Sequence, residues 1–173
     1  MYQHLDVQGN PIALPVGKVA CIGRNYLDHI EEMKSVVSAS PLLFLKPKAA
    51  LCDMGKPLSI PTDQGECHNE LEVAVLLKHA VSKATEDEVL AAIWGIGLGL
   101  DLTLRDVQRE LKAQGQPWER AKSFDLSCPV SGFVPIDSIT DLQDLRFTLS
   151  INGEVRQSGH TAMMLHKIVP LIA

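Results

Sequence analysis

The sequence lacks the features that mark nucleic-acid-binding, secreted and membrane proteins. It contains no run of basic residues and has a formal net charge of −5, which argues against nucleic acid as a partner. No apolar run approaches the roughly 18 residues of a membrane span, so we expect no membrane association. The opening residues, MYQHLDVQGN, have neither the basic nor the apolar region of a secretory signal. We therefore expect a cytoplasmic protein.

The sequence also has few cysteines, and none of them forms a Cys-x-x-Cys pair. The four residues are Cys21, Cys52, Cys67 and Cys128. We expect reduced, buried thiols, because cytosolic proteins seldom carry disulfides. Cys67 and His68 are adjacent, but they have no standard zinc-site spacing to their neighbours. A chain of 173 residues needs no such covalent or metal support, since it can bury roughly 70% of its unfolded surface.

The pattern of apolar residues predicts a mixed α/β fold rich in strands. Short apolar runs predict strands, and periodic or capped segments predict helices. Asn152-Gly153 between two alternating segments predicts a β-hairpin. The expected strands are 18–23, 42–45 and 70–76; a glycine-rich apolar run at 94–102 allows close backbone packing; the expected helices are 25–37, 85–92 with a Thr85–Glu88 capping box, 103–113 and 161–173.

Three carboxylates occupy positions that indicate a metal site. Glu70 and Glu72 are two residues apart on a predicted strand, which places both side chains on one face about 7 Å apart. Asp101 follows a run of small and apolar residues, so we expect it at a strand end near the rim of the core. Like charges on one face of an apolar strand are costly unless a cation offsets them. Three carboxylates are ligands that a hard cation such as Mg²⁺ prefers.

The same spacing permits a simpler interpretation. The carboxylates can be solvent-facing strand charges that pair with nearby basic residues such as Lys46, Lys48 or Arg105. Arg105 is adjacent to Asp106, and we expect these two to form a structural pair. The residues alone do not decide between a metal site and a set of ion pairs.

Two further features suggest catalytic chemistry. His29 and Glu32 are three residues apart on a predicted helix, where the carboxylate could orient the imidazole as a general base. The alternative is a surface salt bridge. Lys122 lies near Trp118 and Phe124, and a partly buried lysine there could stabilise a developing enolate or bind a carboxylate. The alternative is a surface lysine with a packed stem.

Six segments in order resemble the fumarylacetoacetate hydrolase family, in particular its small acylpyruvase and oxaloacetate-decarboxylating members. These segments are GRNYLDHIEEM (23–33), PLLFLKPKAAL (41–51), HNELEVAVLL (68–77), LDLTLRDVQ (100–108), QPWERAKSFDLSCPVSGF (116–133) and INGEVRQSG (151–159). The resemblance covers nearly the whole chain. It implies a β-roll with short flanking helices, and a homodimer.

The resemblance also implies a role for each matching residue. By position, Glu70, Glu72 and Asp101 match the ligands of Mg²⁺ or Mn²⁺; His29 and Glu32 match a catalytic dyad on a lid that orders when substrate binds; Lys122 matches a lysine near the substrate's oxo group; Gln108 and Arg24 match substrate-binding positions. The implied ligand is a small 2-oxo acid.

The expected reaction is hydrolysis of a C–C bond in an acylpyruvate, similar to fumarylpyruvate or acetylpyruvate, through a metal-stabilised enolate. Oxaloacetate decarboxylation and oxaloacetate keto–enol tautomerisation are alternatives, because they use the same metal and the same type of enolate. The carboxylates, histidine and lysine do not rank these reactions.

One departure from the family pattern concerns the C-terminal region. Family members continue past the last apolar helix into a strand and a Thr-Gly-Thr-Pro loop, whereas this sequence ends at Ala173. We expect a single catalytic domain over 1–173, with 1–16 as a lead segment, that continues beyond 173 in the natural protein. The alternative is a truncated, non-catalytic protein that binds oxo acids.

Overall fold

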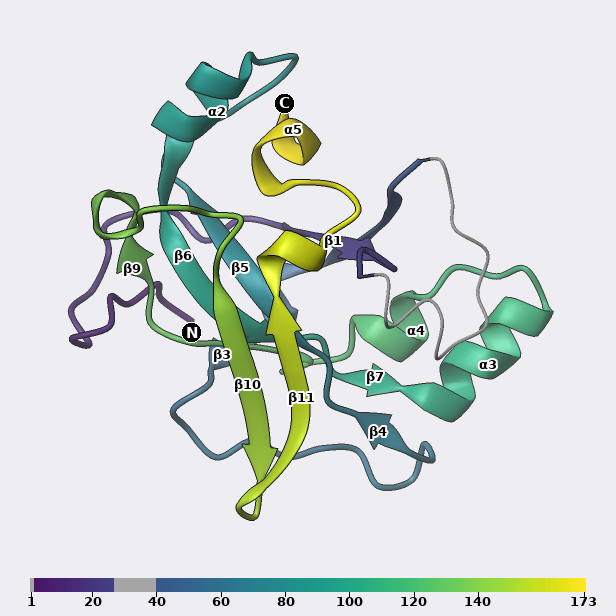
Figure 1. The fold of residues 1–173 in the computed structure, drawn as a ribbon. Helices are drawn as coiled ribbons and strands as arrows, with labels where there is room; N and C mark the ends of the chain where they lie inside the picture. Colours follow the sequence, from purple (N-terminus) through teal and green to yellow (C-terminus); the bar gives the residue numbers. More distant parts are fainter. Residues whose placement is uncertain (1, 27–39) are drawn as a thin grey trace. The chain divides into compact units, whose positions relative to one another are not determined.

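The computed structural model describes residues 2–26 and 40–173 (Figure 1). The chain forms two compact units. Unit 1 comprises Met1–Cys21, Phe44–Ala74 and Ile96–Val134; unit 2 comprises Ile22–Leu43, Val75–Gly95 and Pro135–Ala173.

Most of the regular structure consists of short strands. The strands are β1 (Val19–Gly23), β2 (Leu42–Lys46), β3 (Leu51–Asp53), β4 (Cys67–His68), β5 (Leu71–Leu77), β6 (Ile93–Leu100), β7 (Thr103–Leu104), β8 (Cys128–Val130), β9 (Val134–Pro135), β10 (Arg146–Ile151) and β11 (Glu154–His160). The α-helices are α2 (Glu86–Ala92), α3 (Arg105–Ala113), α4 (Glu119–Lys122) and α5 (Ile168–Ile172), with 3-10 turns η1 (Lys48–Ala50), η2 (Ile136–Ser138) and η3 (Thr161–Met163). The predicted mixed, strand-rich α/β class is confirmed.

The main sheet has the strand order β3-β8-β6-β5, and β9 also pairs with β6. β3 runs parallel to β8, whereas β8 and β6 are antiparallel. Close packing on β6 depends on its glycines: a Cβ at Gly97 would lie 3.1 Å from the Phe133 ring. Glu70 immediately precedes β5 and Asp101 immediately follows β6, and the Asp101 N–H donates to the Glu70 carbonyl over 2.8 Å. The sheet thus brings two of the predicted carboxylates together at its rim.

A small apolar core in unit 1 supports the helices next to these carboxylates. Leu104, Val107, Leu111 and Ala121 are buried together, and Trp118 packs against them. The helical spacing of Val107 and Leu111 turns one face of α3 inward. β7 pairs with β4 in an antiparallel ladder on the same side of unit 1 (Figure 1). This core fixes the helices that carry the basic and amide side chains of the candidate site.

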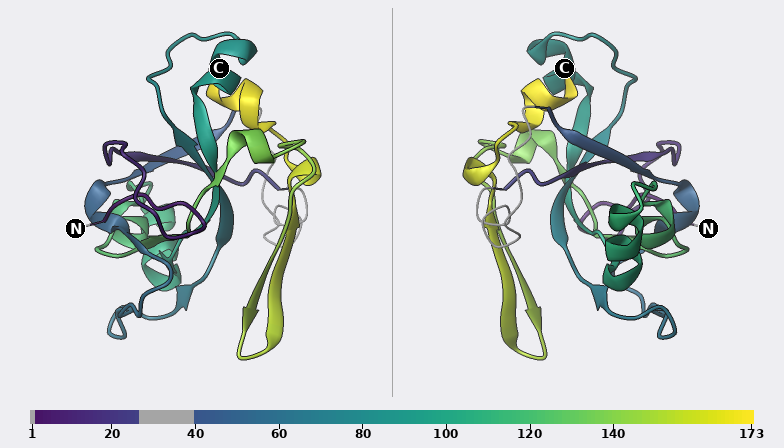
Figure 2. Two further views of the ribbon diagram at one scale, coloured as in Figure 1. Left: turned by 90° about the vertical axis from the view of Figure 1, so that its left-hand side faces the viewer. Right: turned by 90° about the vertical axis from the view of Figure 1, so that its right-hand side faces the viewer.

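The hairpin and the capped helix predicted from the sequence lie in unit 2. Figure 2 shows β10 and β11 as a long antiparallel ribbon. Its turn has positive φ at Asn152 (53°) and Gly153 (83°), as a type I′ turn requires. Thr85 caps α2 through a capping box with Glu88, as predicted.

The predicted helix over 161–173 is wrong. The chain there forms the turn η3, an extended stretch and only a short α5. Asn25 accounts for part of the break, because its side chain and carbonyl bond to the backbone of Leu165 and His166. Pro170 accounts for the rest. Proline is tolerated in the first turn of a helix but not in its interior, so the helix begins only at Ile168.

The four cysteines are free thiols, as predicted, but only Cys128 is buried. Partial burial raises the pKa of Cys21 to about 12, and burial raises that of Cys128 to about 11, which keeps both thiols protonated near neutral pH. Cys52 and Cys67 are half-buried.

No helix in the described part of the chain is both long and apolar enough to cross a bilayer.

Replacing Gly159 with alanine is expected to destabilise the protein, because the added Cβ would lie 2.2 Å from the buried ring of Phe147 across the hairpin. We expect the free energy of unfolding, measured by urea denaturation, to fall by about 1–3 kcal/mol. Ser158→Ala, at the adjacent exposed position, is the matched control and should cost less than about 0.5 kcal/mol. A Gly159→Ala protein as stable as this control would contradict the packing.

Candidate metal and substrate site

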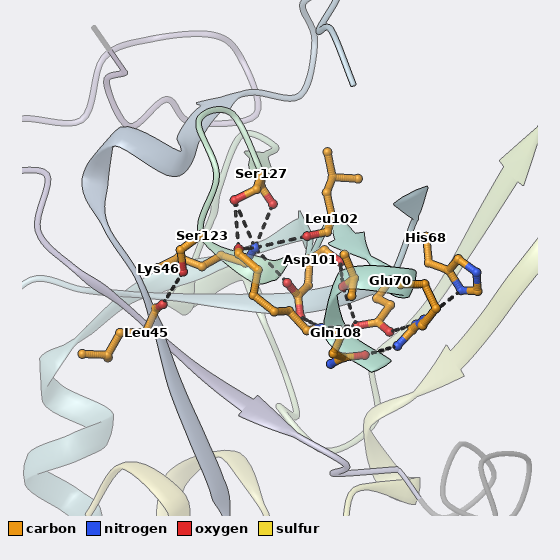
Figure 3. A network of polar contacts seen from close by, with 12 residues as sticks. Leu45, Lys46, His68, Glu70, Asp101, Leu102, Gln108, Ser123 and Ser127 are labelled. Atoms are coloured by element: carbon orange, nitrogen blue, oxygen red, sulfur yellow. Dashed lines mark hydrogen bonds and ion pairs between the residues drawn. The ribbon is translucent and has the colours of Figure 1, made fainter. Parts of the chain in front are cut away.

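Glu70 and Asp101 converge on one cation position. The ammonium of Lys122 lies 2.6 Å from Glu70 Oε2 and 2.5 Å from Asp101 Oδ2. Since one nitrogen reaches both oxygens, the two carboxylates face the same small volume (Figure 3). Thr103 reinforces this arrangement, because its hydroxyl lies 3.3 Å from Glu70 Oε2 and 3.0 Å from the Asp101 carbonyl.

Lys122 ends α4 and is almost fully buried, with a side chain that is 5% exposed. Its ammonium also lies 5.1 Å from the centroid of the Phe44 ring. Burial alone would lower the pKa of Lys122, but the charges and hydrogen bonds of Asp101 and Glu70 raise it above its ordinary value. For Glu70, burial alone would raise the pKa, but the charges and hydrogen bonds of Lys122 and Arg105 lower it to about 2. The lysine is therefore a fixed positive charge and Glu70 a fixed negative one.

Arg105 begins α3 and ties Glu70 to Gln108. Its Nη2 forms an ion pair with Glu70 Oε1, and its Nη1 donates to Gln108 Oε1 over 2.7 Å. Its Nε donates to His68 Nδ1 over 3.3 Å. Gln108 is buried on the inward face of α3. The bond from Arg105 leaves the Gln108 amide nitrogen to donate elsewhere.

The expected pair between Arg105 and Asp106 is wrong. Asp106 instead pairs with Arg109 at 2.6 Å and accepts the Glu66 N–H at 3.1 Å. Adjacent residues on a helix point in different directions, about 100° apart, so Arg105 and Asp106 contact different neighbours.

Lys46 is a second cation beside Asp101. Its side chain is fully buried, and its ammonium lies 2.9 Å from Asp101 Oδ1. The two oxygens of Asp101 therefore face different lysines. The simpler interpretation of the sequence, in which basic neighbours offset the carboxylates, is correct for Lys46 and Arg105. These pairs are buried or nearly so, rather than solvent-facing.

Glu72 differs from the other two carboxylates. Within the described residues no cation or hydrogen-bond donor contacts its side chain. Burial, followed by the charges of Glu70 and Asp101, raises the pKa of Glu72 to about 8. A carboxylate in these surroundings is short of positive charge.

Glu70, Glu72 and Asp101 offer the type of ligand that a hard divalent cation prefers, but in this structure their side chains are not arranged around a common metal position. All three side chains offer oxygen, and two already face a common cation position. Within residues 2–26 and 40–173, no three His, Cys, Asp or Glu side chains are arranged to hold one metal ion. The ammonium of Lys122 takes the position between Glu70 and Asp101, so a metal there requires this side chain to shift and Glu72 to turn toward it.

The structure does not place the other predicted site residues, His29, Glu32 and Arg24, relative to this cluster. His29 and Glu32 lie outside the described residues. Arg24 belongs to unit 2 and has a positive φ of 59°, which is uncommon for a residue with a side chain. The proposed roles of these three residues remain predictions.

Comparison with known proteins identifies the family. The family description "Fumarylacetoacetate (FAA) hydrolase C-terminal" matches residues 18–173. The chain belongs to the fumarylacetoacetate hydrolase family. It is thus a member of an enzyme family, and the resemblance read from its six ordered segments is confirmed.

This family member is similar to proteins named for oxaloacetate chemistry. It is 56% identical to the oxaloacetate tautomerase YcgM of Escherichia coli, over all of this chain and 80% of that protein. A crystal structure of a fumarylacetoacetate hydrolase family protein from Yersinia pestis superposes with a TM-score of 0.97 at 52% identity, covering 99% of this chain and 79% of that one.

A more distant structure carries a metal. It is the fumarylpyruvate hydrolase of Pseudomonas aeruginosa in complex with Mn²⁺ and pyruvate, with a TM-score of 0.88 at 28% identity, covering 97% of this chain and 74% of that one. The comparisons therefore favour the oxaloacetate alternative over acylpyruvate hydrolysis, which the sequence placed first. The motifs could not rank the two, because both expected reactions were assigned to the same predicted site residues.

Lys46 and Arg105 were named from the sequence only as possible ion-pair partners and were not among the predicted site residues. A signal for Lys46 was present in its strand. Period-two alternation places Lys46 on the same face as Leu42 and Phe44, away from the exposed Leu43 and Leu45. The position of Arg105 three residues before Gln108 likewise predicts that their side chains meet on α3.

Lys122→Met should destabilise the metal-free protein, because it leaves Glu70 and Asp101 without the cation between them. We expect the free energy of unfolding in EDTA to fall by about 3 kcal/mol relative to wild type. Saturating Mg²⁺ should narrow this gap by about 2 kcal/mol, because a metal bound between the carboxylates replaces the ammonium charge.

Arg120→Met, which removes an exposed cation from the same helix, is the matched control and should change stability little under either condition. An equal deficit for Lys122→Met with and without Mg²⁺ would show that the ammonium and the metal do not share a position.

Proposed function

We propose that this protein is a divalent-metal-dependent enzyme that interconverts the enol and keto forms of oxaloacetate. The observation that carries the proposal is the convergence of Glu70 and Asp101 on one cation position, which the ammonium of buried Lys122 takes in this structure. The name of the Escherichia coli relative, oxaloacetate tautomerase, supports the choice of substrate and reaction.

The metal ligands would be Glu70, Glu72 and Asp101. Mg²⁺ and Mn²⁺ both prefer oxygen ligands, and the Mn²⁺ complex of the Pseudomonas aeruginosa hydrolase supports this class of ion. A bound divalent ion would supply Lewis-acid polarisation of the substrate's 2-oxo oxygen, which lowers the free energy of the enolate.

The charges around the site favour a dianionic substrate. Once Glu72 is ionised as a metal ligand, the three carboxylates Glu70, Glu72 and Asp101 would be balanced in number by three buried or nearly buried cations, Lys46, Lys122 and Arg105. Adding a divalent ion leaves two positive charges, which oxaloacetate, a dianion, would neutralise. A monoanion such as acetylpyruvate would leave one of these charges uncompensated in a poorly solvated site.

The chain's own residues would direct a single proton transfer. The enol O–H loses a proton and C3 gains one, so the reaction needs no water molecule and no co-reactant. Lys122 supplies a fixed positive charge where the enolate oxygen develops. Gln108 offers an amide donor from α3, and Arg24 is a further proposed substrate contact. His29, oriented by Glu32, is the proposed acid–base group, an assignment that rests on sequence alone.

Tautomerisation should depend on both the metal and Glu70. The measurement is the decay of the ultraviolet absorbance of enol oxaloacetate. With Mg²⁺ or Mn²⁺ we expect enzyme-dependent decay, and Glu70→Gln should lower kcat/KM by at least about 100-fold because it removes a ligand charge. Glu119→Gln, an exposed carboxylate on α4, is the control and should retain full activity. Undiminished turnover in EDTA, or in Glu70→Gln, would refute the metal-dependent scheme.

A panel of substrates separates the proposed reaction from its alternatives. With Mg²⁺ present, oxaloacetate tautomerisation should exceed oxaloacetate decarboxylation and acetylpyruvate hydrolysis by at least about tenfold in kcat/KM, equivalent to ~1.4 kcal/mol. Faster hydrolysis of acetylpyruvate would restore the acylpyruvase interpretation. Metal-dependent binding of oxaloacetate without any turnover would instead indicate the non-catalytic binding protein.

A further inference from the structure

Lys46 is the most completely enclosed charge among the described residues, and the proposed chemistry gives it no direct task. Its side chain is 0% exposed, so no substrate can reach it. Its ammonium contacts Asp101, Leu102, Lys122 and Ser127, all of which belong to unit 1 (Figure 3).

The contacts of Lys46 link the two parts of the backbone that carry the site. It donates to the Ser127 carbonyl at 3.0 Å and to the Leu102 carbonyl at 3.4 Å, directly after Asp101. It also donates to the carbonyl of Lys122 itself. Ser127 reinforces this link, because its hydroxyl donates to the same Lys122 carbonyl at 2.9 Å and lies 3.2 Å from the Lys46 ammonium. One nitrogen therefore fixes the main chain on both sides of the cation position.

The ion pair with Asp101 adds an orientation. Lys46 lies 2.9 Å from Oδ1, whereas Oδ2 faces Lys122 at 2.5 Å. Without a positive charge at Oδ1, the carboxylate plane could rotate about the Cβ–Cγ bond, and neither oxygen would be held toward Lys122. Stability alone does not account for the buried charge of Lys46, because a buried ion pair often gains no stability over well-packed apolar side chains.

We propose that Lys46 is a positioning residue that holds Asp101 Oδ1, so that Oδ2 stays turned toward Glu70 and the cation between them. This inference rests on the proposed function for its metal, but its geometry does not depend on which oxo acid is the substrate. Lys46 acts through Asp101 and through the backbone of Lys122, in the way that outer partners orient metal ligands in other sites.

The test measures Mn²⁺ affinity, from the electron paramagnetic resonance signal of free Mn²⁺, alongside kcat and KM for oxaloacetate. Lys46→Met keeps the length of the side chain and removes the charge. We expect its Mn²⁺ dissociation constant to rise about 10–100-fold, with kcat partly restored by excess Mn²⁺. Lys48→Met, an exposed lysine two residues further along, is the matched control and should bind Mn²⁺ as wild type does.

Two further variants keep the proposal falsifiable if Lys46→Met folds poorly. Ser127→Ala removes one contact of the ammonium and should weaken Mn²⁺ binding by about 2–5-fold, with a melting temperature lowered by only a few degrees. In the Asp101→Asn background, Lys46→Met should cause a smaller additional loss of Mn²⁺ affinity than in the wild-type background, because the main part of its effect acts through Asp101.

Wild-type Mn²⁺ affinity in a folded Lys46→Met protein would overturn the inference, as would unchanged affinity in Ser127→Ala when Lys46→Met does not fold. A lowered melting temperature with unchanged affinity would assign Lys46 a structural role only. Wild-type protein that binds Mn²⁺ but leaves oxaloacetate unchanged would refute the proposed function while the affinities still test Lys46. Wild-type protein that binds no Mn²⁺ would overturn both.

Discussion

The pairing of two partly buried carboxylates with one ammonium is the interaction on which the rest of the site depends. Glu70 precedes β5 and Asp101 follows β6, which are adjacent strands of one sheet. The Asp101 N–H donates a hydrogen bond to the Glu70 carbonyl. This places two negative charges where water screens them poorly, and that is tolerable only with a cation between them. Lys122 supplies that cation from α4, and the small core beneath α3 and α4 holds the helix in place.

The remaining charges follow from this constraint. Arg105 neutralises the second oxygen of Glu70, and Lys46 neutralises the second oxygen of Asp101. Glu72 is left without such a partner among the described residues, and burial together with its two acidic neighbours raises its pKa to about 8. The negative charges of Glu70 and Asp101 are thus neutralised by cations, whereas Glu72 has no cation of its own among the described residues. We infer that the cluster is built to accept a further divalent ion and then an anionic substrate.

Local signals in the sequence predicted much of the fold and the residue types of the site. The strand pattern predicted that Glu70 begins a strand, and the apolar run before Asp101 predicted that Asp101 follows one. The Asn-Gly turn predicted the hairpin, and the capping box predicted α2. The position of Lys46 was harder to predict. Its partners are carbonyls and a hydroxyl that lie 56, 76 and 81 residues along the chain, and such contacts leave no periodic pattern. The predicted C-terminal helix was too long for two reasons. The apolar spacing was given more weight than Pro170, and the contacts of Asn25 that interrupt the helix join residues 141 positions apart in the sequence.

The most direct test of this account is a crystal structure of the protein grown with Mn²⁺, in which anomalous scattering locates the ion. The account predicts a single strong peak within about 2.2 Å of oxygens from Glu70, Glu72 and Asp101, with the ammonium of Lys122 displaced from between the first and last of these. A Mn²⁺ ion bound elsewhere, or Lys122 still seated between Glu70 and Asp101 at saturating Mn²⁺, would contradict it.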